Sequence, residues 1–78
     1  RTYHAVQRQV TFHLGPAHVA YRVDSLVFHL DGHVHVEDVK GVETPRFKVI
    51  RQLWAVHGPC DLWIVKEDGV EIVKGMKR

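Results

Sequence analysis

One helical pattern stands inside a chain that otherwise alternates polar and apolar residues as strands do. Between Pro45 and His57, apolar side chains recur at the three- and four-residue spacing of a helix. Thr44 is a favourable N-cap and Pro45 suits the first helical turn. Gly58 and Pro59 end the pattern. The remainder of the fold therefore has to be built from strands.

Strand-like segments lie on both sides of this helix. Their ranges are 9–14, 19–30, 33–40 and 60–66, and residues 70–73 form either a short final strand or a segment that docks on the sheet. A meander of three strands followed by a right-handed crossover would place the fourth strand parallel to the third. We therefore expect an α/β (α+β) fold, a mixed sheet with the helix of residues 45–57 on one face. The apolar residues of 19–30 change face near Ser25, which predicts a bulge or bend there.

Composition limits the classes of protein that this chain can belong to. With 78 residues, 45% of them hydrophobic, it can form one domain whose core contributes only about 3–5 kcal/mol. A net charge of +2 does not by itself indicate a nucleic-acid partner. The single cysteine, Cys60, excludes an internal disulfide. No apolar run is long enough to span a membrane, so we expect no membrane partner.

Two carboxylates and a lysine are expected to meet on neighbouring strands. Asp38 and Lys40 are two residues apart, so on a strand they point to one face, whereas Glu37 faces away. Asp24 lies on the preceding strand, which is joined to theirs through the turn signal Asp31-Gly32. Two carboxylates with a lysine can hold a divalent metal beside a scissile phosphate.

These residues resemble a known nuclease group. Asp24 with Asp38-Val39-Lys40 is similar to the PD-(D/E)xK signature, and the phrase of residues 36–41 followed by Thr44-Pro45 resembles small phage and prophage nucleases of the domain-of-unknown-function type. That group is related to Holliday-junction resolvases and RecB-like nucleases. The resemblance covers residues 7–66. It implies a minimal restriction-endonuclease-like core over residues 1–78, with three meandering strands, the crossover helix and a parallel fourth strand.

The resemblance also implies an activity and a role for each matching residue. The chain would be a Mg²⁺- or Mn²⁺-dependent DNA endonuclease of the phage or bacterial host cytoplasm, with branched DNA as one candidate substrate. Asp24, Asp38 and the backbone carbonyl of Val39 would be metal ligands. Lys40 would either orient the attacking water or stabilise the transition state. The predicted contacts to nucleic acid are Gln9, Arg46, Lys48 and Arg51, for which an ordinary solvated surface is the alternative.

One departure from the family pattern leaves a second interpretation open. Many members of the group carry an acidic residue on a helix before the first strand, and no Asp or Glu precedes Gln9 here. That ligand is either lost, replaced by Gln7 or Gln9, supplied by a partner subunit or outside this chain, which would then lack an N-terminal helix. The alternative function is therefore a catalytically degenerate module that binds nucleic acid or a protein partner. By analogy with resolvases, we expect a homodimer.

The histidines form no recognisable zinc pattern. His29, His33 and His35 lie on either side of one turn, but there is a single cysteine and no paired short spacing of ligands. We expect them to be surface residues of strands.

Overall fold

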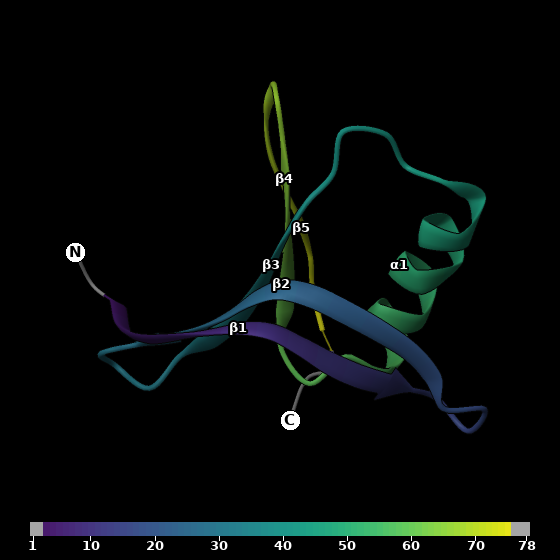
Figure 1. Cartoon of the computed structure of the whole chain (residues 1–78). Coiled ribbons are helices and arrows are strands. Elements are labelled where there is room, and N and C mark those ends of the chain that lie inside the picture. Colours follow the sequence, from purple (N-terminus) through teal and green to yellow (C-terminus); the bar gives the residue numbers. More distant parts are fainter. Residues whose placement is uncertain (1–2, 76–78) are drawn as a thin grey trace.

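Residues 3–75 fold into one five-stranded sheet with a single helix packed against it (Figure 1). This computed structural model describes residues 3–75. In chain order the elements are β1 (Tyr3–Leu14), β2 (Val19–His29), β3 (Val34–Val39), α1 (Pro45–His57), β4 (Asp61–Lys66) and β5 (Gly69–Val73). The strands lie in the sheet in sequence order. Only β3 and β4 are parallel neighbours, because α1 carries the chain back between them.

The expected α/β core of the restriction-endonuclease type is wrong. The structure is mostly sheet, with five strands in a mixed sheet and one helix. β1 begins at Tyr3 rather than Gln9, because its first half pairs with the second half of β2, as in the pair Gln7↔Leu26. β5 adds a fifth strand that pairs antiparallel to β4. Both additions supply backbone partners to strands that would otherwise lie at an open sheet edge.

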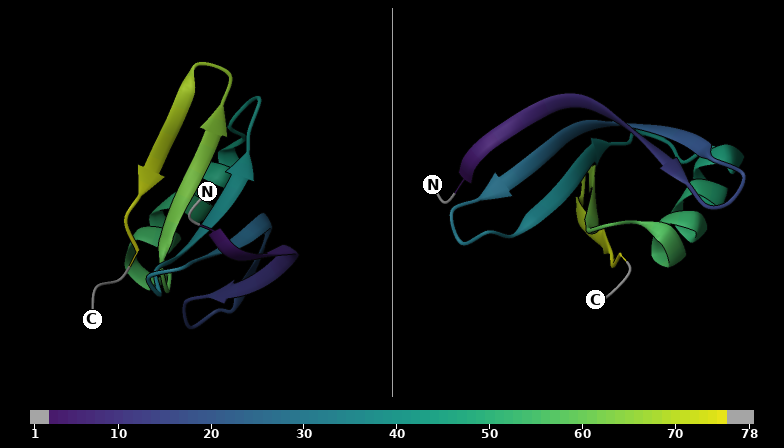
Figure 2. Two further views of the ribbon diagram at one scale, coloured as in Figure 1. Left: turned by 90° about the vertical axis from the view of Figure 1, so that its left-hand side faces the viewer. Right: turned by 90° about the horizontal axis from the view of Figure 1, so that it is seen from below.

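The hydrophobic core lies between α1 and one face of the sheet. The sheet is strongly twisted, and β1 and β2 curve over the helix (Figure 2). The buried cluster draws on both layers and contains Leu14, Tyr21, Val23, Val36, Phe47, Ile50, Trp54, Leu62 and Ile64. Trp54 is completely buried, and its ring lies edge-on to that of Phe12 at 5.1 Å between centroids. The Trp54 indole Nε1–H also donates a 2.6 Å hydrogen bond to the carbonyl of Cys60, which ties α1 to the start of β4.

Both ends of α1 are closed by the residues that the sequence pattern indicated. The Thr44 hydroxyl accepts a 3.2 Å hydrogen bond from the backbone N–H of Phe47. At the other end, the N–H of Gly58 donates to the carbonyl of Trp54 at 2.7 Å. No helix within residues 3–75 has the length and apolar character needed to cross a membrane.

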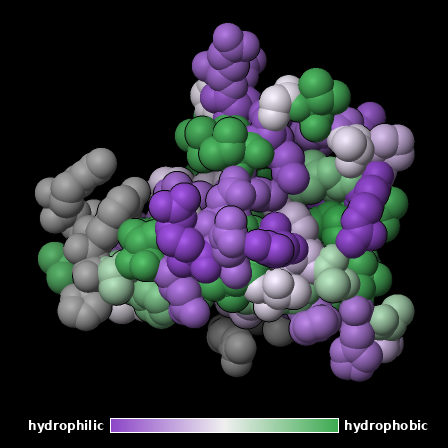
Figure 3. All heavy atoms as spheres, viewed as in Figure 1, coloured by the Kyte–Doolittle hydropathy of each residue, from purple (hydrophilic) through white to green (hydrophobic). Residues whose placement is uncertain are grey.

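The outer surface carries no single large apolar area in the view of Figure 3. Hydrophilic side chains separate the apolar ones on this face. The exposed apolar residues of the described chain include Leu30, Val39 and Val42. Scattered exposure of this kind is ordinary for a small domain.

The side chains of β2 that face the core change from one alternation to the other near the candidate site. Val23 belongs to the buried core and Leu26 packs against it, although residues three apart on a regular strand face opposite sides. The strand therefore bends between them, near Ser25, as the apolar pattern predicted. The pairing of β2 with β3 ends at Ser25↔Glu37. Beyond that pair the two strands separate, and the next residues along each are Asp24 and Asp38.

The close contact between Gly58 and Trp54 gives a test of the core. A Cβ atom at Gly58 would lie 2.5 Å from the Trp54 ring, which is fully buried and fixed by its hydrogen bond. We predict that Gly58→Ala lowers the free energy of unfolding by about 1–3 kcal/mol. Urea unfolding would measure it. Gly41→Ala is the matched control, because a Cβ at Gly41 meets no atom within 4 Å; equal losses in the two variants would contradict this account.

Candidate functional site

The structure brings Asp24 and Asp38 together where β2 and β3 separate. The backbone N–H of Val39 donates to Asp24 Oδ2 at 2.9 Å, so the Asp24 side chain reaches across to the end of β3. Asp24 is exposed, whereas Asp38 is only 3% exposed. One carboxylate therefore faces solvent and the other lies beneath it.

Two side chains hold the buried carboxylate. The hydroxyl of Tyr21 donates to Asp38 Oδ2 at 2.5 Å, and Lys40 Nζ lies 3.1 Å from the same oxygen. Burial raises the pKa of the Asp38 carboxyl above its ordinary value, and the adjacent Asp24 adds to the increase. The hydrogen bonds from Tyr21 and Lys40 act in the opposite direction. The pocket therefore makes the Asp38 carboxyl harder to ionise than a solvent-exposed aspartate.

Lys40 is fixed at both ends. Its backbone N–H donates to the carbonyl of Val65 at 3.0 Å, which anchors the end of β3 to β4. Its ammonium lies 4.6 Å from the centre of the Phe47 ring. The cation is therefore directed toward Asp38 and the start of α1.

Tyr21 is a site residue that the sequence analysis did not identify. Burial raises its pKa far above the usual range, and the hydrogen bond to Asp38 acts in the same direction. The hydroxyl therefore stays protonated and serves as a permanent donor to Asp38. The available signal was the alternation of β2, which places Tyr21 on the core-facing side together with Val23.

The carboxylate oxygens of Asp24 and Asp38 are suitable ligands for a hard divalent cation, but two side chains do not complete its coordination shell. Their contacts with Tyr21, Val39 and Lys40 go to Oδ2, and the two carboxyl groups also contact each other. No group of three or more His, Cys, Asp and Glu side chains in the same residues could hold a metal. A Mg²⁺ ion here would need several waters in its shell, which is its usual state in proteins.

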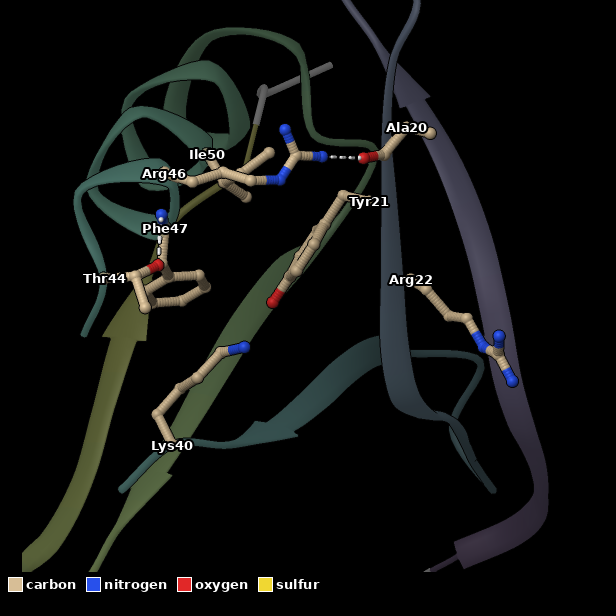
Figure 4. A pocket seen from close by; sticks show the side chains of 8 residues that line it. All are labelled: Ala20, Tyr21, Arg22, Lys40, Thr44, Arg46, Phe47 and Ile50. Carbon is tan, nitrogen blue, oxygen red and sulfur yellow. Dashed lines mark hydrogen bonds between the residues drawn. The ribbon is translucent and has the colours of Figure 1, made fainter. Parts of the chain in front are cut away.

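A cavity of about 260 Å³ lies beside Tyr21 and Lys40, the two side chains that bind Asp38 (Figure 4). It is lined by Ala20, Tyr21, Arg22, Lys40, Thr44, Arg46, Phe47 and Ile50. Figure 4 shows the Tyr21 hydroxyl pointing toward the Lys40 ammonium. Arg46 extends from α1 and donates to the carbonyl of Ala20 at 2.8 Å. Two basic side chains that come from different elements thus converge on one hollow.

The predicted nucleic-acid contacts on α1 lie in different surroundings. Arg46 lines the cavity, and Lys48 is exposed on the helix outside it. Arg51 is instead held by carboxylates: it bonds both oxygens of Glu43 at 2.9 and 3.0 Å and also bonds Glu71. Lys66 contacts the same two glutamates, so the charge of Arg51 is largely compensated within the fold.

Gln9 lies on β1 at the level of Asp24 on β2. It occupies the position in β1 between the pairs Arg8↔Ser25 and Val10↔Val23, which is opposite Asp24. Its φ angle is 57°, a left-handed conformation that is rare for a residue other than glycine. Its side-chain oxygen accepts a 2.7 Å hydrogen bond from Arg22.

A second polar group lies on the opposite face of the sheet. His35 is 3% exposed, so the expectation that the histidines are surface residues is wrong for it. One ring nitrogen of His35 is 2.7 Å from His29 and the other is 2.8 Å from Glu37. The His35 ring also stacks on Trp63 with 3.8 Å between centroids. Glu37 therefore points away from Asp38, as strand alternation predicted.

The raised pKa of Asp38 predicts a pH-dependent gain in stability when its charge is removed. A carboxyl whose pKa is raised on folding favours the folded state most below its ordinary pKa, and this contribution is lost as pH rises through the folded-state value. Asp38→Asn should therefore increase the free energy of unfolding at neutral pH, by on the order of 1 kcal/mol. The gain should disappear in acid. Urea unfolding between pH 3 and 8 would measure it, with Asp68→Asn in the exposed turn before β5 as the charge control. A loss of stability at neutral pH would contradict this assignment.

Comparison with known proteins gives a family for the chain. A family model described as a protein of unknown function (DUF1064) matches residues 6–77. The matched region contains the carboxylate pair, Lys40 and the whole lining of the cavity. No curated protein and no solved structure matches the chain.

Proposed function

We propose that this chain, which belongs to the family DUF1064, is a metal-dependent endonuclease that hydrolyses phosphodiester bonds in DNA. The observation that carries the proposal is the meeting of Asp24 and Asp38 at the point where β2 and β3 separate, with Lys40 Nζ 3.1 Å from Asp38. The resemblance of these residues to the PD-(D/E)xK signature supports the same activity.

Each residue of the site has a distinct role in the proposed hydrolysis. Asp24 and Asp38, with the carbonyl of Val39, would hold Mg²⁺ or Mn²⁺, which supplies Lewis-acid polarisation and lowers the pKa of a bound water. Lys40 faces the carboxylates, where its charge can stabilise the negative charge that develops on the phosphoryl oxygens. The Tyr21 hydroxyl keeps Asp38 in one orientation through its hydrogen bond. Arg46 offers a cation to the DNA backbone beside the site.

The existing partners of Asp38 favour a second candidate function, that of a module that binds without cleaving. Asp38 already has a hydrogen-bond donor and an ammonium as partners, and the described residues offer no third carboxylate to complete a ligand set. A catalytically degenerate module that binds nucleic acid or a protein would retain this arrangement as a structural charge pair. Cleavage and metal binding distinguish the two functions.

The first test is cleavage of a labelled four-way junction and a matched linear duplex, each with Mg²⁺, Mn²⁺ or a chelator. We expect metal-dependent cleavage by the unaltered protein. We expect Asp24→Asn and Asp38→Asn to lower the rate on the order of 10²–10³-fold, because each removes a charged metal ligand at the reacting phosphate. The ratio of rates on the two substrates measures any preference for branched DNA.

Glu37→Gln is the matched control, because Glu37 neighbours Asp38 in sequence but lies on the other face with His35. It should leave the cleavage rate within about threefold of the unaltered protein. Cleavage that survives both aspartate substitutions would refute the assignment of the site. Binding of DNA without cleavage in any metal would favour the degenerate module.

A further inference from the structure

We infer that the cavity between β2 and the first half of α1 is a binding site for a phosphate group of the nucleic acid, separate from the scissile phosphate at the carboxylates. The inference rests on the proposed function for the identity of the substrate. The cavity itself, with its charge and its size, indicates the chemistry of the ligand.

The cavity lining is basic and hydroxylic. Its charged members are Arg22, Lys40 and Arg46, and none of the described residues that line it is acidic. Arg22 turns its guanidinium away toward Gln9 of β1, so Lys40 and Arg46 are the cations that face the hollow (Figure 4). Such a surface attracts an anion and repels a metal cation.

Arg46 has N–H groups that can donate hydrogen bonds to such an anion. It is exposed, and a single NH₂ group is engaged with the carbonyl of Ala20. A guanidinium carries five N–H donors in a fork that matches two phosphate oxygens. The Thr44 hydroxyl accepts a bond from Phe47, so its own hydrogen is free to be donated.

The volume favours a small ligand. About 260 Å³ is below the usual range for a drug-sized molecule, which is roughly 300–1,000 Å³. A phosphate with part of its sugar fits that space, and Phe47 and Ile50 provide apolar contacts for the sugar carbons. A base pair is too large for this cavity.

The cavity lies next to the carboxylate pair at which we propose that DNA is cleaved. Tyr21 and Lys40 line the cavity and both bind Asp38 Oδ2. A phosphate seated between Lys40 and Arg46 would therefore lie one side chain away from the carboxylate pair. Holding one phosphate there would fix the register of the strand, so that a neighbouring phosphodiester reaches Asp24 and Asp38.

The test is a titration with sodium phosphate in chelator, followed by ¹⁵N NMR on the intact chain. We expect saturable shifts at the amides of Tyr21, Thr44 and Arg46. Arg46→Ala should weaken this binding about tenfold or more, because a charge-assisted bidentate contact is lost. Arg46→Lys, which retains the charge but loses the fork, should weaken it less, and it also guards against a folding defect in the alanine variant.

Lys48→Ala is the matched control, since Lys48 is a neighbouring cation on α1 outside the cavity. It should change phosphate affinity less than twofold. Equal weakening by Arg46→Ala and Lys48→Ala, or shifts without saturation, would overturn the inference. Because no metal is present, this result is independent of cleavage: a protein that binds phosphate here but never cuts DNA refutes only the proposed function.

Two ligands then distinguish the source of the phosphate. Thymidine 5′-monophosphate carries a terminal phosphate, whereas a thymidine dinucleotide with hydroxyls at both ends carries only an internal one. Tighter binding of the dinucleotide assigns the cavity to a phosphate within a strand. Tighter binding of the monophosphate assigns it to a strand end.

Discussion

The buried carboxylate of Asp38 is the interaction on which this site depends. A lone charge beneath the surface of so small a domain would cost several kcal/mol, on the order of what the whole core contributes. Tyr21 and Lys40 make it tolerable by binding one oxygen from two sides. Each of these partners is fixed by the fold, Tyr21 by its place in the core and Lys40 by its backbone bond to Val65.

The end of the pairing between β2 and β3 leaves space beside the Asp38 carboxylate. Regular pairing of β2 with β3 ends at Ser25↔Glu37, and the bend in β2 lies at the same level. Asp24 then uses its side chain, rather than its backbone, to bond the N–H of Val39. The carboxylate thus replaces a lost contact between the strands and reaches the end of β3.

Parts of this architecture could be predicted from local signals. Thr44-Pro45 and Gly58-Pro59 define α1 because capping and helix termination depend on neighbouring residues. The meeting of Asp24 with Asp38 followed from a hairpin and strand alternation. The fold class was wrong because the first half of β1 is a strand through its pairing with the second half of β2, which its composition does not reveal. It was also wrong because residues 69–73, for which the sequence left a docking segment as an alternative, pair with β4 across a tight turn.

The rest of the site depends on register and on contacts that are distant in sequence. Tyr21 reaches Asp38 across 17 residues, and its role becomes visible only once β2 and β3 are aligned. Arg51 carries the same charge as Arg46 on the same helix, but two glutamates from separate segments engage it. A basic cluster in sequence therefore separates into one cation that lines the cavity and one that stabilises the fold.

Two residues with an energetic cost lie near the point where β2 and β3 separate, one on β1 and one on β3. Gln9 adopts a left-handed conformation opposite Asp24, and strain of this kind typically costs about 1–3 kcal/mol. Near the end of β3, burial raises the pKa of Asp38 and so disfavours its charge. Strained backbone and carboxyls with shifted pKa values concentrate at functional sites, because they are retained where chemistry or binding requires them. Asp38 is bound by Tyr21 and Lys40, which line the basic cavity, and this arrangement supports a site for a phosphate-bearing ligand.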